Sequence, residues 1–346
     1  MVIFSAMYPL RVIIIISLLT AGMRANAQAP RHYVCYQTRE AISIDGLPTE
    51  TSWQQAVWTE DFSDIEGDAR PAPLHRTRVK MCWDAQHLYI FAELTEPHIW
   101  ATLRQHDTII FHDNDFEVFI DPDGDTHQYF EIEINALNTV MDLFMSKPYR
   151  NGGPAMLNWD TKGLRTAVHI NGTLNNPADK DRSWTVEMAI PFKALAFFNT
   201  RITPEEGATW RINFSRVQWQ TDVVNGRYVK RPKTPEYNWV WSPQGIINMH
   251  APEKWGYLQF SAIPGTPFRE PATAGAQQAL RELYHRQQRY RRQHGHYTSD
   301  PAALGWQDTA YQPVIEATST QFTATIRQAG FVNIIDHEGK IIFRHE

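Results

Sequence analysis

Short runs in which apolar and polar residues alternate dominate the chain from Tyr33 to Phe260. Turn-forming residues separate these runs, for example Asp45-Gly46. Alternation with a period of two is typical of strands with one buried face, and many short strands with turn signals between them indicate an antiparallel sandwich or barrel. We therefore predict an all-β fold, an antiparallel sandwich or barrel, over residues 28–262. The expected strands include 77–83, 88–94, 116–120, 128–135, 164–170, 183–190, 210–218 and 255–260.

The pattern changes beyond residue 262. Residues 263–274 contain three prolines and are predicted to form a linker. Apolar residues then recur at helical spacing, at Ala276, Leu280, Leu283 and Tyr284, and Gly295 is a suitable helix stop. Three short strands are expected after it, at 322–326, 332–335 and 340–343. Residues 275–346 are therefore predicted to form a small C-terminal α+β appendage.

The first 27 residues have the features of a secretory signal peptide. Arg11 precedes an apolar run of about ten residues, and Ala25-Asn26-Ala27 is a small-x-small cleavage site. The run is too short to span a bilayer, which needs about 20 residues, and no later segment of the mature chain is predicted to span a membrane. We expect cleavage after Ala27 and a periplasmic or secreted protein.

Charge and cysteine content narrow the class of partner. The 346 residues carry a formal net charge of −5, which argues against nucleic acid as the ligand. The two cysteines, Cys35 and Cys82, do not have a zinc-binding spacing. An exported protein can form a disulfide between them, and two separately buried thiols are the alternative.

The most informative polar pattern lies at 111–142. Alternation places Glu131, Glu133 and Asn135 on one sheet face, and Glu117 joins them if its strand pairs with theirs as a hairpin. Carboxylates and amides bind sugar hydroxyls well, because each can engage two adjacent hydroxyl groups. The alternative is a solvated outer face. Between the two strands, Asp121, Asp123 and Asp125 are spaced as a calcium loop requires, although an Asx-type turn explains them as well.

Enzyme signatures are mostly missing from the sequence. There is no GxSxG, no HExxH and no phosphate-binding loop. A glycoside hydrolase remains an alternative, because retaining enzymes need only two carboxyl groups about 5–5.5 Å apart, and Glu117 with Glu131 or Glu133 could supply them. Sugar binding also needs aromatic platforms, for which Phe111 and Trp159 are candidates.

An ordered set of motifs resembles the family 9 carbohydrate-binding modules and the related DOMON domains. These motifs are Ile44-Asp-Gly46 with Glu50 and Trp53, Trp83-Asp84 with Leu88-Tyr-Ile90, Asn114-Asp-Phe-Glu-Val-Phe-Ile-Asp121, and Trp184 with Glu187 and Ile190-Pro191. The resemblance covers about 40–260. It implies that residues 28–262 form a two-sheet antiparallel β-sandwich that binds the ends of glucans or xylans, often with structural calcium.

The resemblance also assigns roles to particular residues. Glu117 matches the family's sugar-binding glutamate, Phe111 stands where the first clamp tryptophan is expected, and Trp159 is the candidate for the second. The family's arginine position falls near Glu133, so the sugar site departs from the family pattern. Some DOMON relatives hold heme through a methionine, for which Met141 and Met145 are available, but two methionines at this spacing are more often core residues.

The C-terminal helix and the segment after it, as far as Leu304, faintly resemble the helix-to-sheet passage of type IV pilin-like subunits, without the pilin membrane segment. We treat this part as a packing module. The leading prediction is an exported, non-catalytic protein that recognises a polysaccharide or oligosaccharide in carbohydrate catabolism. A xylanase-associated hydrolase and a heme or redox module are the alternatives.

Overall fold

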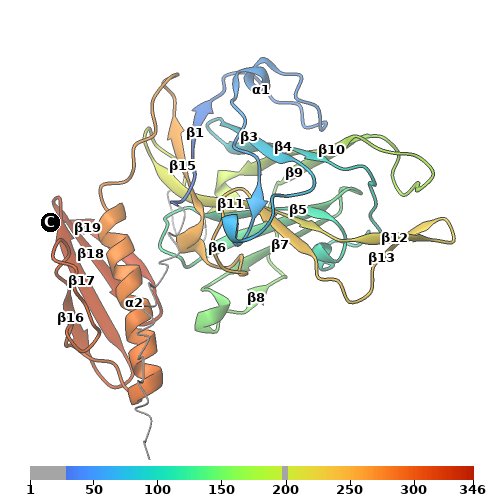
Figure 1. Cartoon of the computed structure of the whole chain (residues 1–346). Helices are drawn as coiled ribbons and strands as arrows, with labels where there is room; N and C mark the ends of the chain where they lie inside the picture. The colour runs from blue at the N-terminus through green and yellow to red at the C-terminus, as the bar shows by residue number, and fades with distance from the viewer. Residues whose placement is uncertain (1–28, 197–201) are drawn as a thin grey trace, which may run out of the picture.

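A computed structural model describes residues 29–196 and 202–346, so the predicted signal peptide lies outside the described residues. A 13-stranded sheet forms the main body (Figure 1). Its order is β8-β7-β6-β5-β11-β15-β1-β3-β4-β10-β9, and β14 pairs with both β11 and β2. The strands are β1 (His32–Gln37), β2 (Ser63–Asp64), β3 (Thr77–Trp83), β4 (His87–Thr95), β5 (Asp115–Asp121), β6 (Tyr129–Asn135), β7 (Val140–Met145), β8 (Ala155–Met156), β9 (Arg165–Asn171), β10 (Ser183–Pro191), β11 (Thr209–Gln218), β14 (Tyr237–Val240) and β15 (Gly256–Ser261).

The sheet curls so that the apolar faces of its distant strands enclose one core. Phe116 of β5 and Ile132 of β6 belong to the same buried cluster as Ile90 of β4 and Val186 of β10. This arrangement is consistent with a β-sandwich, but hydrogen bonds join the strands into one sheet rather than two. The sheet is also not purely antiparallel, because β1 lies between β15 and β3 and runs parallel to both.

A buried glutamate in the last of the sequence motifs binds residues of the first motif, which explains why the two motifs occur together. Glu187 on β10 accepts hydrogen bonds from the backbone amides of Asp45 and Gly46, both at 2.9 Å, and from Trp53 Nε1 at 2.8 Å. Gly46 has a φ of 83°, and a Cβ there would meet the backbone of His169 at 2.9 Å. Only glycine fits this turn readily. The short helix α1 (Thr51–Gln55) is thereby fixed to the sheet.

The C-terminal appendage is a helix packed on a four-stranded antiparallel sheet (Figure 1). Helix α2 (Ala274–His294) buries Leu280 and Leu283 against the sheet. The strands are β16 (Val314–Ala317), β17 (Phe322–Gln328), β18 (Phe331–Asp336) and β19 (Ile341–His345). The sequence predicted only three of these strands, because β16 has four residues, of which only Ile315 is buried. Residues 263–273, within the predicted linker 263–274, contain no helix or strand, and α2 begins at Ala274.

Both cysteines are buried and free, so the disulfide alternative is not realised. Cys35 belongs to the main core cluster, whereas Cys82 belongs to the cluster around Trp53 on the other side of the sheet. Side chains on opposite faces of a sheet cannot bridge. Among the described residues, no helix is long and apolar enough to cross a membrane.

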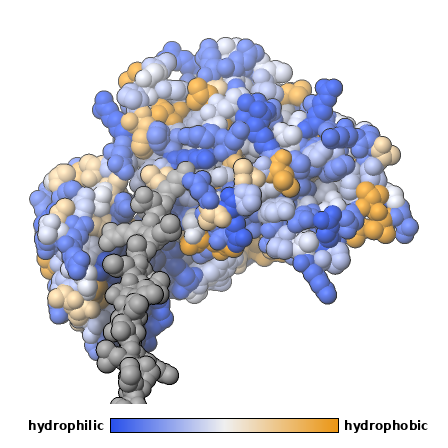
Figure 2. Space-filling view, in the orientation of Figure 1, coloured by the Kyte–Doolittle hydropathy of each residue, from blue (hydrophilic) through white to orange (hydrophobic). Residues whose placement is uncertain are grey.

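Apolar residues on the face shown in Figure 2 are scattered, with one patch at the end where a small hairpin projects. The hairpin consists of β12 (Thr221–Val224) and β13 (Arg227–Lys230). It exposes Val223, Val224 and Val229.

Candidate functional site

The predicted carboxylate face forms on the outer side of the β5–β6 pair. Glu117 and Glu133 are direct cross-strand partners, and Glu131 lies opposite Phe119. The expected hairpin pairing that brings Glu117 to this face is therefore confirmed. All three glutamates are less than 5% exposed, so the alternative of a solvated outer face is wrong. The burial arises because loops fold over this side of the sheet.

These loops enclose a pocket of about 290 Å³ above the three glutamates. Strand residues form its floor, and the segments before β5, after β7 and before β15 form its walls. The aromatic residues Phe111 and Tyr149 line it and are 36% and 49% exposed, so both are accessible to a ligand. The other lining residues are mainly apolar or amide-bearing, including Met141, Leu143, Leu157, Val217, Asn238, Asn248 and Met249.

Burial and mutual repulsion raise the pKa values of Glu117, Glu131 and Glu133, so these three groups hold their protons unusually strongly. Burial, and then the charge of Glu117, raises the pKa of Glu131 to about 8. Burial and Glu133 raise the pKa of Glu117, and burial and Glu131 raise that of Glu133. Groups of this kind can both donate and accept hydrogen bonds near neutral pH, which is the property that recognition of hydroxyl groups uses.

One carboxyl oxygen of the pocket is buried without a hydrogen-bond partner. Glu133 Oε2 accepts a bond from the Phe111 backbone amide at 3.0 Å, which fixes the Phe111 backbone beside the carboxyl group. Glu131 Oε2 is buried and has no hydrogen-bond partner. His250 Nε2 is 3.6 Å from this oxygen, and Tyr129 holds the other ring nitrogen of His250 at 2.9 Å. Burial lowers the pKa of His250 to about 4, so the imidazole is uncharged at neutral pH.

Two of the sequence-predicted site residues lie elsewhere. The amide of Asn135 is committed to the protein: its nitrogen bonds Leu103 O and Asp113, and its oxygen accepts from the amides of Leu137 and Thr139. The half-buried Trp159 packs its ring 4.9 Å from that of Phe130, which belongs to the main core. Neither residue lines the pocket, so their roles in binding stay predictions without structural support.

The Asp121–Asp125 loop connects β5 to β6 and contacts the C-terminal appendage. Its three carboxylates converge, with ligand atoms within 4.8 Å of one another. Asp121 accepts from the amides of Gly124 and Thr126. Asp123 and Asp125 each accept from the amide two residues on, as an Asx-type turn requires. Lys340 Nζ lies 3.0 Å from Asp125 Oδ2, and the Ile341 amide bonds Asp125 O. Lys340 thus supplies one positive charge that a calcium ion would otherwise bring, and calcium at this loop stays a prediction.

The methionines considered for heme lie on the same side of the sheet as the pocket. Met141 lines the pocket, whereas Met145 is fully buried in the apolar cluster around Tyr129 and Trp255. Packing accounts for the position of Met145.

The sequence did not single out Tyr149, His250 or Glu236, although all three line the pocket. Glu236 and His250 come from segments far from β5 and β6 along the chain, whereas Tyr149 lies in the turn after β7, and no local pattern marks any of them. The exposed aromatic residue beside the Asn151-Gly-Gly-Pro154 turn was the one available signal for Tyr149.

The comparisons agree with this fold. The sequence profile of the family described as "Carbohydrate family 9 binding domain-like" matches residues 44–240, more than half of the chain, and the chain belongs to this family. A solved carbohydrate-binding candidate from Bacteroides uniformis shares 16% identity at a TM-score of 0.51, covering 67% of this chain and all of its own. A family 9 module from Caldicellulosiruptor kristjanssonii, solved with glucose, shares 15% identity at a TM-score of 0.44, covering 69% of this chain and all of its own. A search of curated proteins found no match.

Proposed function

We propose that this chain is an exported, non-catalytic carbohydrate-binding protein whose ligand occupies the pocket over Glu117, Glu131 and Glu133. The observation that carries the proposal is this pocket itself, which combines buried carboxyl groups with accessible aromatic rings in a member of a carbohydrate-binding family. The signal-like features of residues 1–27 support export.

The chemistry of the pocket suits a sugar. The carboxyl groups of the three glutamates that line the pocket can engage adjacent hydroxyl groups, and the exposed rings of Phe111 and Tyr149 can pack on the C–H face of a pyranose. A volume of about 290 Å³ is at the small end of the range for ligand pockets. We therefore infer that the pocket takes the end or a short stretch of a polysaccharide or oligosaccharide.

The charge of the pocket restricts the class of sugar. No lysine or arginine is among the described residues that line it, and four glutamates are, including Glu236. An anionic sugar such as a uronic acid would meet buried carboxyl groups without a compensating cation, which is unfavourable. Neutral sugars and amino sugars are the expected ligands.

A glycoside hydrolase is the second candidate, favoured by one observation. Glu117 and Glu133 are a cross-strand pair that places two carboxyl groups in one pocket. One oxygen of each carboxyl group lies within 4.8 Å of one oxygen of the other. Their raised pKa values are also a property of general acids. Binding and hydrolysis therefore have to be separated by experiment.

The test is affinity electrophoresis of residues 28–346 on gels that contain neutral glucans, xylans, chitosan or polygalacturonate, with a reducing-sugar assay on the same glycans. Retention by a neutral or amino glycan without sugar release is the expected result. Sugar release that Glu117→Gln abolishes would establish the hydrolase instead. No retention on any glycan, or retention on polygalacturonate alone, would contradict the proposal.

A further inference from the structure

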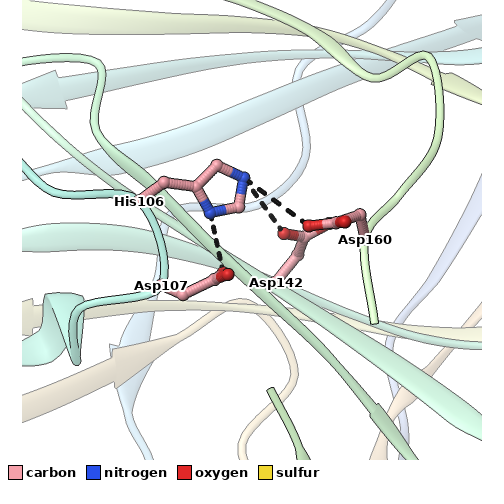
Figure 3. A group of neighbouring side chains, drawn as sticks. All are labelled: His106, Asp107, Asp142 and Asp160. Carbon is pink, nitrogen blue, oxygen red and sulfur yellow. Dashed lines mark ion pairs between the residues drawn. The ribbon is translucent and has the colours of Figure 1, made fainter. Parts of the chain in front are cut away.

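A second cluster of charged side chains lies outside the pocket and has no role in the proposed function. It contains His106 and Asp107 from the loop before β5, Asp142 from β7 and Asp160 from the loop after β8 (Figure 3). One ligand atom from each residue lies within 4.8 Å of the others. The cluster thus joins three segments that are separated along the chain.

The geometry around His106 has two parts. Its Nδ1 lies 2.7 Å from Asp107 Oδ1, an ion-pair contact whose angles are not those of a hydrogen bond. Its Nε2 lies 3.8 Å from Asp142 Oδ1 and 3.9 Å from Asp160 Oδ1, and Figure 3 shows both carboxylates on this side of the ring. The two longer distances exceed the length of a hydrogen bond.

These distances are, however, compatible with ligands of a single ion. Metal–nitrogen and metal–oxygen bonds to histidine and carboxylate are each about 2.0–2.2 Å for zinc, so two ligands of one ion lie at most about 4.2 Å apart. His106 Nε2 therefore falls within reach of an ion held by Asp142 and Asp160. Asp107 at Nδ1 favours a proton on that nitrogen, which leaves the Nε2 lone pair directed at the two carboxylates. A carboxylate behind the histidine is the usual support of a metal-binding imidazole.

A buried oxygen gives an independent indication of a missing partner. The side chain of Asp142 is only 2% exposed, and its Oδ2 accepts a hydrogen bond from the Thr161 amide. Its Oδ1, which points toward His106, accepts no hydrogen bond. A buried polar atom without a partner is costly. In addition, three aspartates surround a single histidine, so negative charge exceeds positive charge even when the histidine is protonated.

We propose that His106, Asp142 and Asp160 bind a divalent transition-metal ion, with Asp107 as the positioning residue of His106. The imidazole selects for such an ion over calcium or magnesium, which prefer oxygen ligands alone. His106 and Asp160 are 56% and 71% exposed, so the ion can enter from solvent and water can complete its coordination. Nothing in the site depends on the identity of the sugar.

The position of the cluster implies a structural effect of the ion. Ile109 and Phe111 lie shortly after His106 in the chain and line the sugar pocket, as does Leu157, which precedes Asp160. An ion would therefore tie together the two loops that form walls of the pocket. This consequence rests on the proposed function, whereas metal binding itself does not.

The test is isothermal titration of residues 28–346 with Zn²⁺, with Mn²⁺ and with Ca²⁺, after chelator treatment and dialysis. We expect one ion per chain at this site. Asp107→Asn should weaken binding by about 10–100-fold, as loss of such a supporting carboxylate usually does, and His106→Gln and Asp142→Asn by at least as much. His106 is exposed, so its variant remains informative if Asp142→Asn misfolds. Melting curves check the fold of each variant.

The matched control addresses adventitious zinc. His294 and His296 lie near each other at the end of α2, with ring centroids 6.4 Å apart, and are the obvious competing site. Binding should persist in His294→Ala/His296→Ala. The proposal is overturned if neither Zn²⁺ nor Mn²⁺ binds, if His106→Gln binds as tightly as the wild type, if the control double variant loses the ion, or if only Ca²⁺ binds. If the protein binds the metal ion but is not retained by any glycan, the proposed function is contradicted and the proposed metal site is not.

Discussion

The substitution Glu131→Gln should stabilise the protein at alkaline pH and leave its stability nearly unchanged at acidic pH. Burial and Glu117 raise the pKa of Glu131 from 4.5 to about 8. Below pH 4.5 the folded and unfolded chains both hold the proton, so the group has no net effect. Between pH 4.5 and 8 only the folded chain retains it, and stability falls as pH rises. Above pH 8 the full cost of burying the charge remains.

The size of the effect can be worked from the same pKa. At 1.36 kcal/mol per pH unit, a rise from 4.5 to about 8 corresponds to about 5 kcal/mol when the group is ionised. Glutamine keeps the shape of the side chain and cannot ionise. Glu117 and Glu133 remain in the variant and continue to repel one another, so we expect a gain of about 2–5 kcal/mol at pH 8.5. For a domain of this size the melting temperature should rise by at least about 4 °C.

The assay is differential scanning calorimetry of wild type and variant from pH 4.5 to pH 8.5. The control is Glu253→Gln, whose pH dependence should have the opposite sign. Burial alone would raise the pKa of Glu253, but Arg150, 2.9 Å away, and Arg281 lower it. Its contribution is therefore present at neutral and alkaline pH and lost in acid. The reasoning is refuted if Glu131→Gln lowers the melting temperature equally at both ends of the pH range.

Three further predictions concern the scaffold. Glu187→Ala removes the shared acceptor of three buried donors and should cost about 3–5 kcal/mol in urea unfolding; a loss below 1 kcal/mol would show that the motif it anchors is not structural. Lys340→Met leaves the carboxylates of the Asp121–Asp125 loop without their cation, so added calcium should raise the melting temperature more in this variant than in wild type, and an equal response would contradict that account. Cys35 and Cys82 are buried and their pKa values are raised by burial, so a thiol reagent should label both only after denaturation, and rapid labelling of the native protein would contradict the fold.

Local patterns predicted the strands because each strand buries one face. The alternation in residues 116–120 and 128–135 placed Glu117, Glu131 and Glu133 on one side, and the observed register confirms it. The pattern could not show that this side is buried as well. That burial depends on segments far along the chain, such as the loop carrying His250, which folds over the outer face.

Connectivity was harder to predict than strand positions. A strand shows the same alternation of apolar and polar residues whether it runs parallel or antiparallel to its neighbour. Nothing in the sequence of β1 therefore shows that it runs parallel to both of its neighbours. Likewise, Trp159 comes after a glycine-rich turn, and this position predicts an accessible ring that a sugar can pack on. In the structure the ring packs against Phe130 instead, a contact that the local sequence does not predict. Lys340 could be paired with Asp125 only once the docking of the appendage was known.

The central claim is that the acidic pocket binds sugar, and one affinity comparison tests it most directly. Titration calorimetry with the best-retained glycan should be carried out on wild type, on Phe111→Ala and on the control variant Glu316→Gln. Glu316 is an exposed acidic residue of the appendage. Phe111 is partly exposed at the pocket, so its loss should leave the fold intact. We predict at least about a tenfold loss of affinity for Phe111→Ala, equivalent to about 1.4 kcal/mol, and none for Glu316→Gln. Equal affinity in all three proteins would contradict the claim.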